Sequence, residues 1–204
     1  FILLSTLCAW FGMNDIDSAK ASFKDQAVIF KRKHNWLMCW LYIGTFGSFI
    51  GFAAGFALLT KQVFPAIDPT KLAFLGPLVG ALMRVVGGWL SDKFPASKVT
   101  QASFIIMILA VIGVMIFLPQ NGQGGSFIGF FASFMLLFAA TGIGNASTFA
   151  QAPRIFSALH RHHAKVFGLS EAEADNNAAK ESAAVVGFMG AVGAYGGFFI
   201  PKSF

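Results

Sequence analysis

Residues 72–93 read LAFLGPLVGALMRVVGGWLSDK, and this stretch decides the fold class. Its apolar part, residues 72–90, matches the roughly 20 residues that a helix needs to cross a bilayer. Further runs of this kind lie at residues 36–59, 102–118, 127–155 and 183–200, and residues 1–13 are typical of the truncated end of another. None shows the in–out alternation over ~10 residues that marks the strands of a membrane barrel. The sequence therefore predicts an all-α integral membrane protein of about five and a half transmembrane helices.

The composition of the whole chain excludes a soluble domain. Hydrophobic residues make up 56% of the 204 residues and charged residues 12%, whereas soluble domains carry about 25% charged residues. The net charge of +6 would suggest nucleic acid as a partner of a soluble chain. Here the basic residues lie between apolar runs, where they set orientation in the membrane. We therefore expect a lipid bilayer, and not nucleic acid, around this protein.

The charge of the connectors predicts the orientation. Basic residues gather in the first, third and fifth connectors: Lys20, Lys24, Lys31, Arg32, Lys33, Lys93, Lys98, Arg154, Arg161, Lys165 and Lys180. The other side of the membrane receives Lys61, Lys71 and Lys202. By the positive-inside rule, residues 14–35 form a cytoplasmic central loop, and residues 91–100 and 157–180 are further cytoplasmic connectors. Residues 36–204 are then a transmembrane bundle.

The start of the chain is not a signal peptide. It opens with FILLSTLCAWFG and lacks an initiator Met, a basic segment and a small-residue cleavage site. We expect a fragment of a larger membrane protein.

Arg84 is a charge in the middle of a predicted span. Such an arginine costs about 2.5–3.5 kcal/mol on insertion scales, so it calls for a functional or structural reason. It could pair with a carboxylate or with backbone carbonyls, but all 9 acidic residues fall in connectors or at span ends. Alternatively it faces a water-filled cavity and binds an anion. A guanidinium forks two N–H donors toward a planar oxyanion, which suits a small anion of this shape.

Glycines and one aromatic pair are the next candidates. Tyr42 and Phe46 lie one helical turn apart and share a face, where they could wall a small site or simply pack in the core. Glycines crowd the last span, among them Gly187 and Gly190, and a Gly142–Gly144 segment opens the polar stretch Asn145–Thr148. Small residues let helices approach closely. Those near Gly187 also leave room for helix bending and for a small ligand.

A short motif closes the Arg84 helix. In Gly88-Trp-Leu-Ser-Asp92-Lys93, the carboxylate of Asp92 could pair with a neighbouring helix end and latch that side of the bundle. Gly88, Asp92 and Lys93 are therefore candidates for a cytoplasmic gate.

Other chemistry has little support in the sequence. Cys8 and Cys39 lie in apolar stretches without the spacing of a metal site or a disulfide framework. The HRHH stretch, with His160, His162 and His163, fits a solvated loop better than a metal site. No H-E-x-x-H, C-x-x-C or G-x-S-x-G motif occurs. We expect no cofactor, no metal and no enzyme activity.

The chain resembles the nitrate/nitrite porters of the major facilitator superfamily over essentially its whole length. The resembling segments are AWFGMNDI, TFGSFIGFAAGFALL, GPLVGALMRVVGGWLSDKF, NGQGGSFIGFFA, GIGNASTF and GFMGAVGAYGGFFIPKSF. The last is similar to a glycine-rich nitrate signature, and Gly88…Asp92-Lys93 to the superfamily's cytoplasmic loop motif. Pro95-Ala96 departs from that motif, which usually has Gly there.

The resemblance implies a fold, a site and an activity. It places the chain from the end of helix six to helix eleven of a twelve-helix transporter in a bacterial inner membrane, with the N-terminal half missing. It makes Arg84 one of two arginines that clamp nitrate or nitrite, with Tyr42, Phe46, Gly187 and Gly190 beside the anion. Nitrate/nitrite exchange by alternating access is the activity expected. A nitrate/proton symporter is the first alternative, and an anion-binding sensor or channel a distant one.

Overall fold

The computed structural model describes residues 2–13, 26–119, 124–168 and 170–203. These ranges are helical and contain no strand, and 5 of the helices are long and apolar enough to cross a membrane. The predicted all-α membrane fold is thus confirmed. Residues 14–25, with most of the predicted central loop, lie outside the described residues.

The described elements follow one another from α1 to η5. They are α1 (Ile2–Gly12), η2 (Ala27–Lys31), α3 (Lys33–Tyr42), the π-helical turn η3 (Ile43–Gly47), α4 (Ser48–Val63), η4 (Pro69–Lys71), α5 (Leu75–Lys93), α6 (Ala96–Phe117), α7 (Phe127–Phe167), α8 (Glu171–Ala194), α9 (Gly196–Phe199) and η5 (Pro201–Ser203). Together α3, η3 and α4 make one continuous membrane-length helix, Lys33–Val63.

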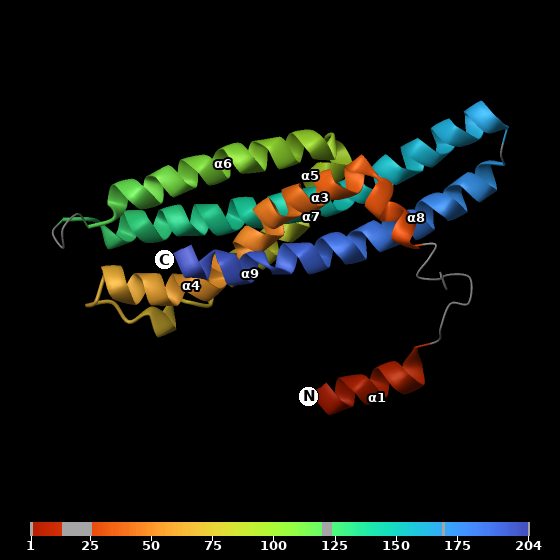
Figure 1. The fold of residues 1–204 in the computed structure, drawn as a ribbon. Coiled ribbons are helices and arrows are strands. Elements are labelled where there is room, and N and C mark those ends of the chain that lie inside the picture. Colours follow the sequence, from red (N-terminus) through yellow and green to blue (C-terminus); the bar gives the residue numbers. More distant parts are fainter. Residues whose placement is uncertain (1, 14–25, 120–123, 169, 204) are drawn as a thin grey trace.

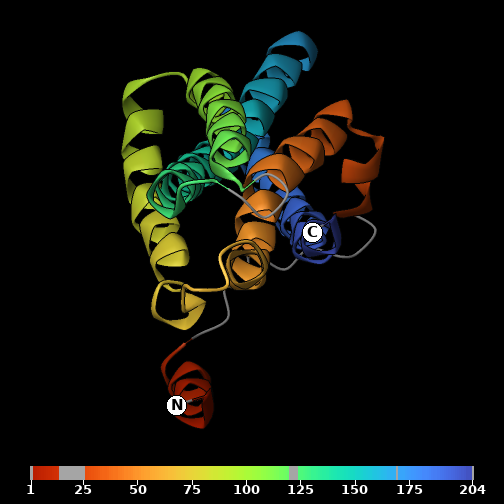
Figure 2. The same ribbon diagram turned by 90° about the vertical axis from the view of Figure 1, so that its left-hand side faces the viewer.

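Helix α7 lies at the centre of the bundle. It contacts α3, α4, α5, α6 and α8, and Figure 2, which looks along the bundle, shows these helices around it. Figure 1 shows α1 apart from the others, and no side chain of α1 is buried.

Most of the predicted connector at residues 157–180 is helical in the structure. Helix α7 continues to Phe167 and α8 begins at Glu171, so the two extend side by side beyond the apolar region (Figure 1). Gly168 ends α7 in the left-handed conformation, at φ 70°, and the Ser170 side chain accepts a hydrogen bond from the Glu173 N–H at the start of α8. Hydropathy marks the part of a helix that crosses lipid, whereas capping decides where the helix ends.

Glycines fix the position of α5 along α7. A Cβ on Gly142 would lie 2.2 Å from the Gly80 carbonyl oxygen, so the two backbones touch. A Cβ on Gly76 would meet the Phe138 ring at 2.2 Å. Because these contacts leave no room for sliding, Arg84, one turn beyond Gly80, is held at a set height in the bundle.

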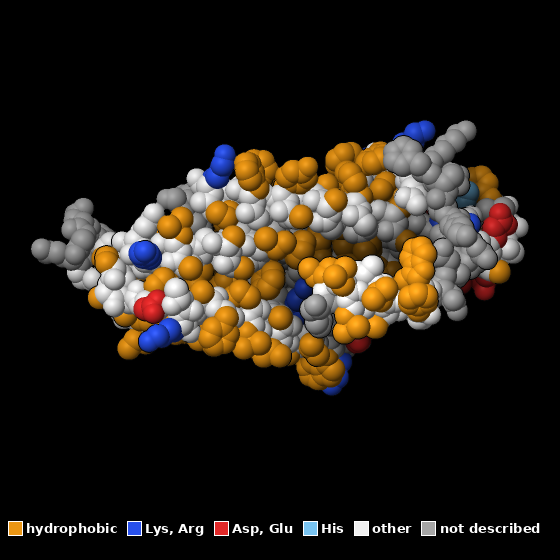
Figure 3. All heavy atoms as spheres, turned by 90° about the horizontal axis from the view of Figure 1, so that it is seen from below, with side chains coloured by type: hydrophobic (Ala, Val, Ile, Leu, Met, Phe, Trp, Pro, Cys, Tyr) orange, Lys and Arg blue, Asp and Glu red, His pale blue; other side chains and the backbone are white. Residues whose placement is uncertain are grey.

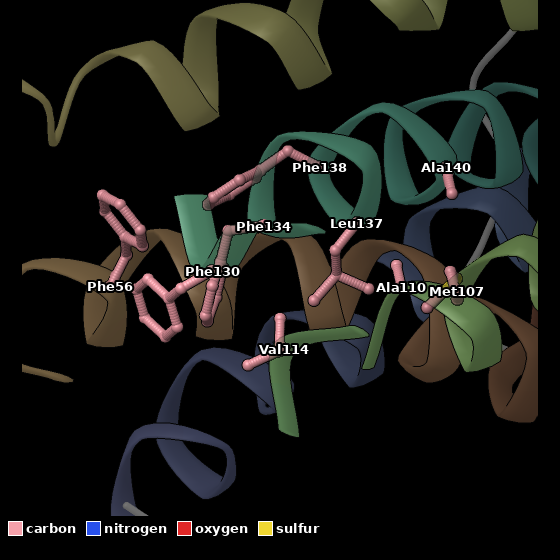
Figure 4. Close-up of a cluster of buried hydrophobic side chains, with 9 residues drawn as sticks. All are labelled: Phe56, Met107, Ala110, Val114, Phe130, Phe134, Leu137, Phe138 and Ala140. Atoms are coloured by element: carbon pink, nitrogen blue, oxygen red, sulfur yellow. The ribbon is translucent and has the colours of Figure 1, made fainter. Parts of the chain in front are cut away.

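An aromatic core closes the end of the bundle where α7 begins. Figure 4 shows rings from α4 and α7 turned toward one another, with aliphatic residues of α6 beside them. The ring centroids of Phe130 and Phe134 lie 4.9 Å apart, and those of Phe56 and Phe134 lie 5.1 Å apart. Phe56, Phe130 and Phe138 are fully buried. This cluster is built of apolar side chains, and the charged groups described below lie elsewhere.

The ion pair between the α7 and α8 extensions leads to a prediction about the pKa of Asp175. Arg161 Nε donates to Asp175 Oδ1 at 2.9 Å, and this hydrogen bond, together with the guanidinium charge, lowers the pKa of Asp175. A lowered folded-state pKa stabilises the folded protein above the ordinary carboxyl pKa, and this contribution is lost as the pH falls through the lowered value. We expect Arg161→Gln to raise the pKa of Asp175 toward its ordinary value, measured by NMR of the labelled carboxyl carbon. Arg154→Gln is the control and should leave it unchanged; equal pKa values in the wild type and Arg161→Gln would contradict the assignment.

Candidate functional site

Arg84 projects from α5 and has no partner in the part of the chain that the structure describes. It is exposed, and none of the described residues forms a hydrogen bond or an ion pair with it. The arginines 32, 154 and 161 each contact a carboxylate, so Arg84 differs from them. Figure 3 shows a face on which many hydrophobic side chains lie among white backbone and other side chains, with a few charged groups between them. Of the two readings of this arginine, structural pairing finds no support within the described part of the chain.

Tyr42 and Phe46 form a stacked pair that lies within the electrostatic reach of Arg84. Their ring centroids lie 5.0 Å apart with planes tilted by 25°, so the two rings do share one face. Tyr42 ends α3 and Phe46 lies in the π-helical turn η3, a feature that is frequent at functional sites. Arg84 is close enough to act electrostatically on the Tyr42 hydroxyl. The structure therefore brings Tyr42 and Phe46 together, with the charge of Arg84 acting on the Tyr42 hydroxyl from α5.

The hydroxyl of Tyr42 has a partner that sequence reasoning did not single out. It donates a hydrogen bond to Asn145 Oδ1 at 3.3 Å, across from α3 to α7. Asn145 is fully buried. The sequence offered only a weak signal for it, a polar stretch in an apolar helix.

The glycines of α8 divide into two kinds. At Gly187 and Gly190 nothing among the described residues lies within 4 Å of an added Cβ, so these two predicted site residues border open space. Gly193, which sequence reasoning did not choose, lies against the rings: a Cβ there would come within 2.8 Å of Tyr42 Cδ1 and 3.1 Å of Phe46 Cδ1. A run of glycines in the sequence does not reveal which of them touches the aromatic pair.

Gly193→Ala is expected to displace the aromatic pair. The added methyl group overlaps two ring carbons, so the rings must shift by several tenths of an ångström, at a cost of about 1–3 kcal/mol for an overpacked site. Thermal unfolding of the purified protein should occur at a lower temperature than in the wild type. Ala194→Ser, at the next and exposed position of α8, is the control and should leave the unfolding temperature unchanged. Unfolding of Gly193→Ala at the wild-type temperature would contradict the tight contact.

The predicted gate residues have separate contacts. Arg154 Nη2 donates to Asp92 Oδ1 at 3.1 Å, and Arg154 Nη1 donates to the Ser91 carbonyl oxygen at 2.6 Å. The prediction that Asp92 pairs with a neighbouring helix is therefore correct. The partner, Arg154, lies within α7, whereas a partner at a helix end was predicted. Lys93 Nζ lies 4.1 Å from the centre of the Trp89 ring on its own helix. Gly88 borders open space.

A second charged cluster lies at the same end and was not predicted. Glu181 of α8 is buried, and it accepts hydrogen bonds from Arg32 Nε at 2.6 Å and Arg32 Nη2 at 3.2 Å. His160 Nε2 lies 2.6 Å from Glu181 Oε2, the oxygen that also accepts from Arg32 Nη2. The cluster links the start of α3 to α7 and α8. His160, a member of the cluster, lies on helix α7 instead of in the expected loop. No group of three potential metal ligands occurs in the described ranges.

Comparisons with known proteins agree on one family. No protein-family model matches the chain. The nitrate/nitrite transporter NarU of Salmonella typhimurium is 48% identical over 203 residues, and that of Escherichia coli is 47% identical over 204. The chain belongs to the nitrate/nitrite porter family. A probable nitrate/nitrite antiporter, NarK2 of Thermus thermophilus, is 38% identical over 202 residues.

The porter chain is shorter than these relatives. All of it aligns with the two NarU proteins, and it spans about 44% of their length. As a multi-pass membrane protein of the major facilitator superfamily, it presents Arg84 on α5 and the Tyr42–Phe46 pair on α3 and η3, elements that all pack against α7. Chemically, this candidate site offers a permanent cation, an aromatic wall and one hydroxyl, and no carboxylate of the described residues pairs with the cation. That set is suited to holding a small anion.

Proposed function

We propose that this protein is the greater part of one half of a secondary transporter that exchanges nitrate and nitrite across a membrane. The observation that carries the proposal is Arg84, which pairs with no carboxylate among the described residues and whose charge reaches the Tyr42 hydroxyl. The names of the relatives, nitrate/nitrite transporter and antiporter, supply the two anions. Nitrate and nitrite are small planar oxyanions that a guanidinium binds through two parallel hydrogen bonds.

In this proposal a second half of the transporter faces Arg84 and adds an arginine of its own. Two cations that face each other repel, and a bound anion lowers that repulsion, so the halves close readily only when the site is occupied. Alternating access by rocking of two halves around a midplane site is general in such transporters. Because the empty site resists closure, exchange is favoured over net uptake. The end of the bundle with Asp92, Arg154 and Glu181 faces the cytoplasm of a bacterial cell.

The test uses the full-length protein in liposomes. Nitrite is loaded inside, labelled nitrate is added outside, and uptake is followed with and without an inward proton gradient. Uptake that requires internal nitrite and ignores the gradient supports exchange. The absence of nitrate uptake under every condition would refute the proposed function.

The contact between Glu181 and His160 favours a second candidate, nitrate/proton symport. Proton coupling needs a titratable group inside the bundle, and Glu181 is a buried carboxylate bonded to an imidazole. In that case the proton gradient drives nitrate into liposomes that lack nitrite, and Glu181→Gln abolishes the effect of the gradient. Exchange that is unaffected by Glu181→Gln would eliminate this candidate.

A further inference from the structure

Asn145 carries a buried hydrogen-bond donor for which the described part of the chain provides no acceptor. Its side chain is 0% exposed in the middle of α7, and Oδ1 accepts from the Tyr42 hydroxyl at 3.3 Å. Its Nδ2 group is bonded to nothing among the described residues. Leaving a buried amide N–H unpaired costs about 1–3 kcal/mol, so this arrangement calls for an explanation.

The hydroxyl groups of three nearby threonines are not free to donate to an anion, because each already donates to a backbone carbonyl oxygen. Thr141 Oγ1 donates to the Phe138 carbonyl oxygen at 2.9 Å, and Thr148 Oγ1 donates to the Gly144 carbonyl oxygen at 2.7 Å. On the facing helix, Thr45 Oγ1 donates to the Leu41 carbonyl oxygen at 3.1 Å. These three hydroxyl groups are engaged with the backbone of their own helices, whereas Asn145 Nδ2 has no acceptor among the described residues.

The Tyr42 hydroxyl has a single proton, and its direction decides what the site can bind. If that proton points to Asn145, the hydroxyl turns only lone pairs toward Arg84, and lone pairs repel an anion. Rotation of the Asn145 amide by 180° exchanges its oxygen and nitrogen at nearly the same atomic positions. Nδ2 then donates to the Tyr42 oxygen, and the Tyr42 proton is released. The rotation leaves a buried carbonyl oxygen unpaired in place of an N–H, and proteins tolerate this more often.

We propose that Asn145 is a positioning residue that makes Tyr42 a hydrogen-bond donor to the anion held by Arg84. The inference rests on the proposed function and deepens it by naming the residue that orients the site. Asn145 Nδ2 donates to Tyr42, Tyr42 donates to an anion oxygen, and Arg84 supplies the charge. Successive hydrogen bonds of this kind polarise and strengthen one another. Removal of Asn145 therefore weakens the binding of the anion through Tyr42, without direct contact.

The experiment is a double-mutant cycle on the full-length transporter in liposomes loaded with nitrite. KM and kcat for labelled nitrate are measured for the wild type, Tyr42→Phe, Asn145→Leu and the double variant. We expect each single variant to raise KM about tenfold, which corresponds to the loss of about 1.4 kcal/mol, with kcat changed less. In the double variant KM should rise no further, because Asn145 acts through the hydroxyl that Tyr42→Phe removes. Thr148→Val, which removes a buried hydroxyl bonded to its own helix, is the matched control with unchanged KM.

Each outcome separates the two proposals. If the single effects on KM multiply in the double variant, or if Asn145→Leu leaves KM unchanged while Tyr42→Phe raises it, Asn145 does not act through Tyr42 and only this inference falls. If the unmodified protein carries no nitrate, the proposed function falls and the inference with it. Asn145→Ala, which is smaller than the native side chain, completes the same cycle if Asn145→Leu does not insert into the membrane.

Discussion

Arg84→Lys is expected to lower nitrate uptake at least about tenfold, even though the charge is kept. A lysine ammonium is a compact, strongly hydrated point charge, whereas the arginine fork matches a planar oxyanion with two parallel hydrogen bonds. Loss of one charge-assisted hydrogen bond of about 1.5–3 kcal/mol accounts for a change of this size or more. Arg84→Ala, which also removes the charge, should abolish uptake. The measurement is the initial rate of labelled nitrate entry into liposomes that contain the full-length protein and internal nitrite.

The matched control for this prediction is Arg161→Lys. Arg161 is exposed on the α7 extension and pairs with Asp175, so the same substitution there tests the chemistry of the side chain far from the site. Its uptake rate should equal that of the wild type. Wild-type KM and rate in Arg84→Lys would show that a point charge suffices, and the fork geometry would have to be abandoned.

Gly142→Ala is expected to destabilise the protein by about 1–3 kcal/mol or more, the range for overpacked sites. The new Cβ would lie 2.2 Å from the Gly80 carbonyl oxygen. Since the obstacle is backbone and not the end of a flexible side chain, α5 and α7 must separate to accommodate it. The unfolding temperature in detergent should fall clearly. Uptake should fall with it, because α5 carries Arg84.

Gly187→Ala makes the same chemical change where there is room. Nothing among the described residues lies within 4 Å of its Cβ, and alanine stabilises a helix interior by about 0.5–1 kcal/mol relative to glycine. Its unfolding temperature should therefore equal or exceed that of the wild type. If Gly142→Ala and Gly187→Ala unfolded at the same temperature, the close approach of α5 and α7 would be refuted.

The parts of the fold that could be predicted are those that depend on local chemistry. Apolar length revealed the membrane helices, because the bilayer imposes a minimum number of residues on each of them. An isolated charge in a span drew attention to Arg84, since charge is costly there. Tyr42 and Phe46 were paired from their spacing alone, because residues four apart share a helix face.

The parts that could not be predicted depend on contacts between distant segments. Asn145 bonds to a residue 103 positions away, and Glu181 to one 149 positions away. A single sequence gives no distance across such intervals. Gly193 differs from Gly187 and Gly190 only in what faces it. The extensions of α7 and α8 were not predicted, because their charged residues were interpreted as a loop. Such residues form stable helices in water when the helix ends are capped.

The π-helical turn η3 has a consequence for how the first membrane-length helix tolerates changes in length. A π-turn holds one residue more than an α-turn, and each residue advances an α-helix by about 100°. That one extra residue therefore determines the relative orientation of two helix faces. One is the face of α3 that presents Tyr42, and the other is the face of α4 that packs against α9. Deleting a single residue from Ile43–Gly47 would give a more regular helix and at once turn one of the two faces away from its partner. The irregular turn thus sets the rotation of α4, which packs against α9, relative to α3, which presents Tyr42.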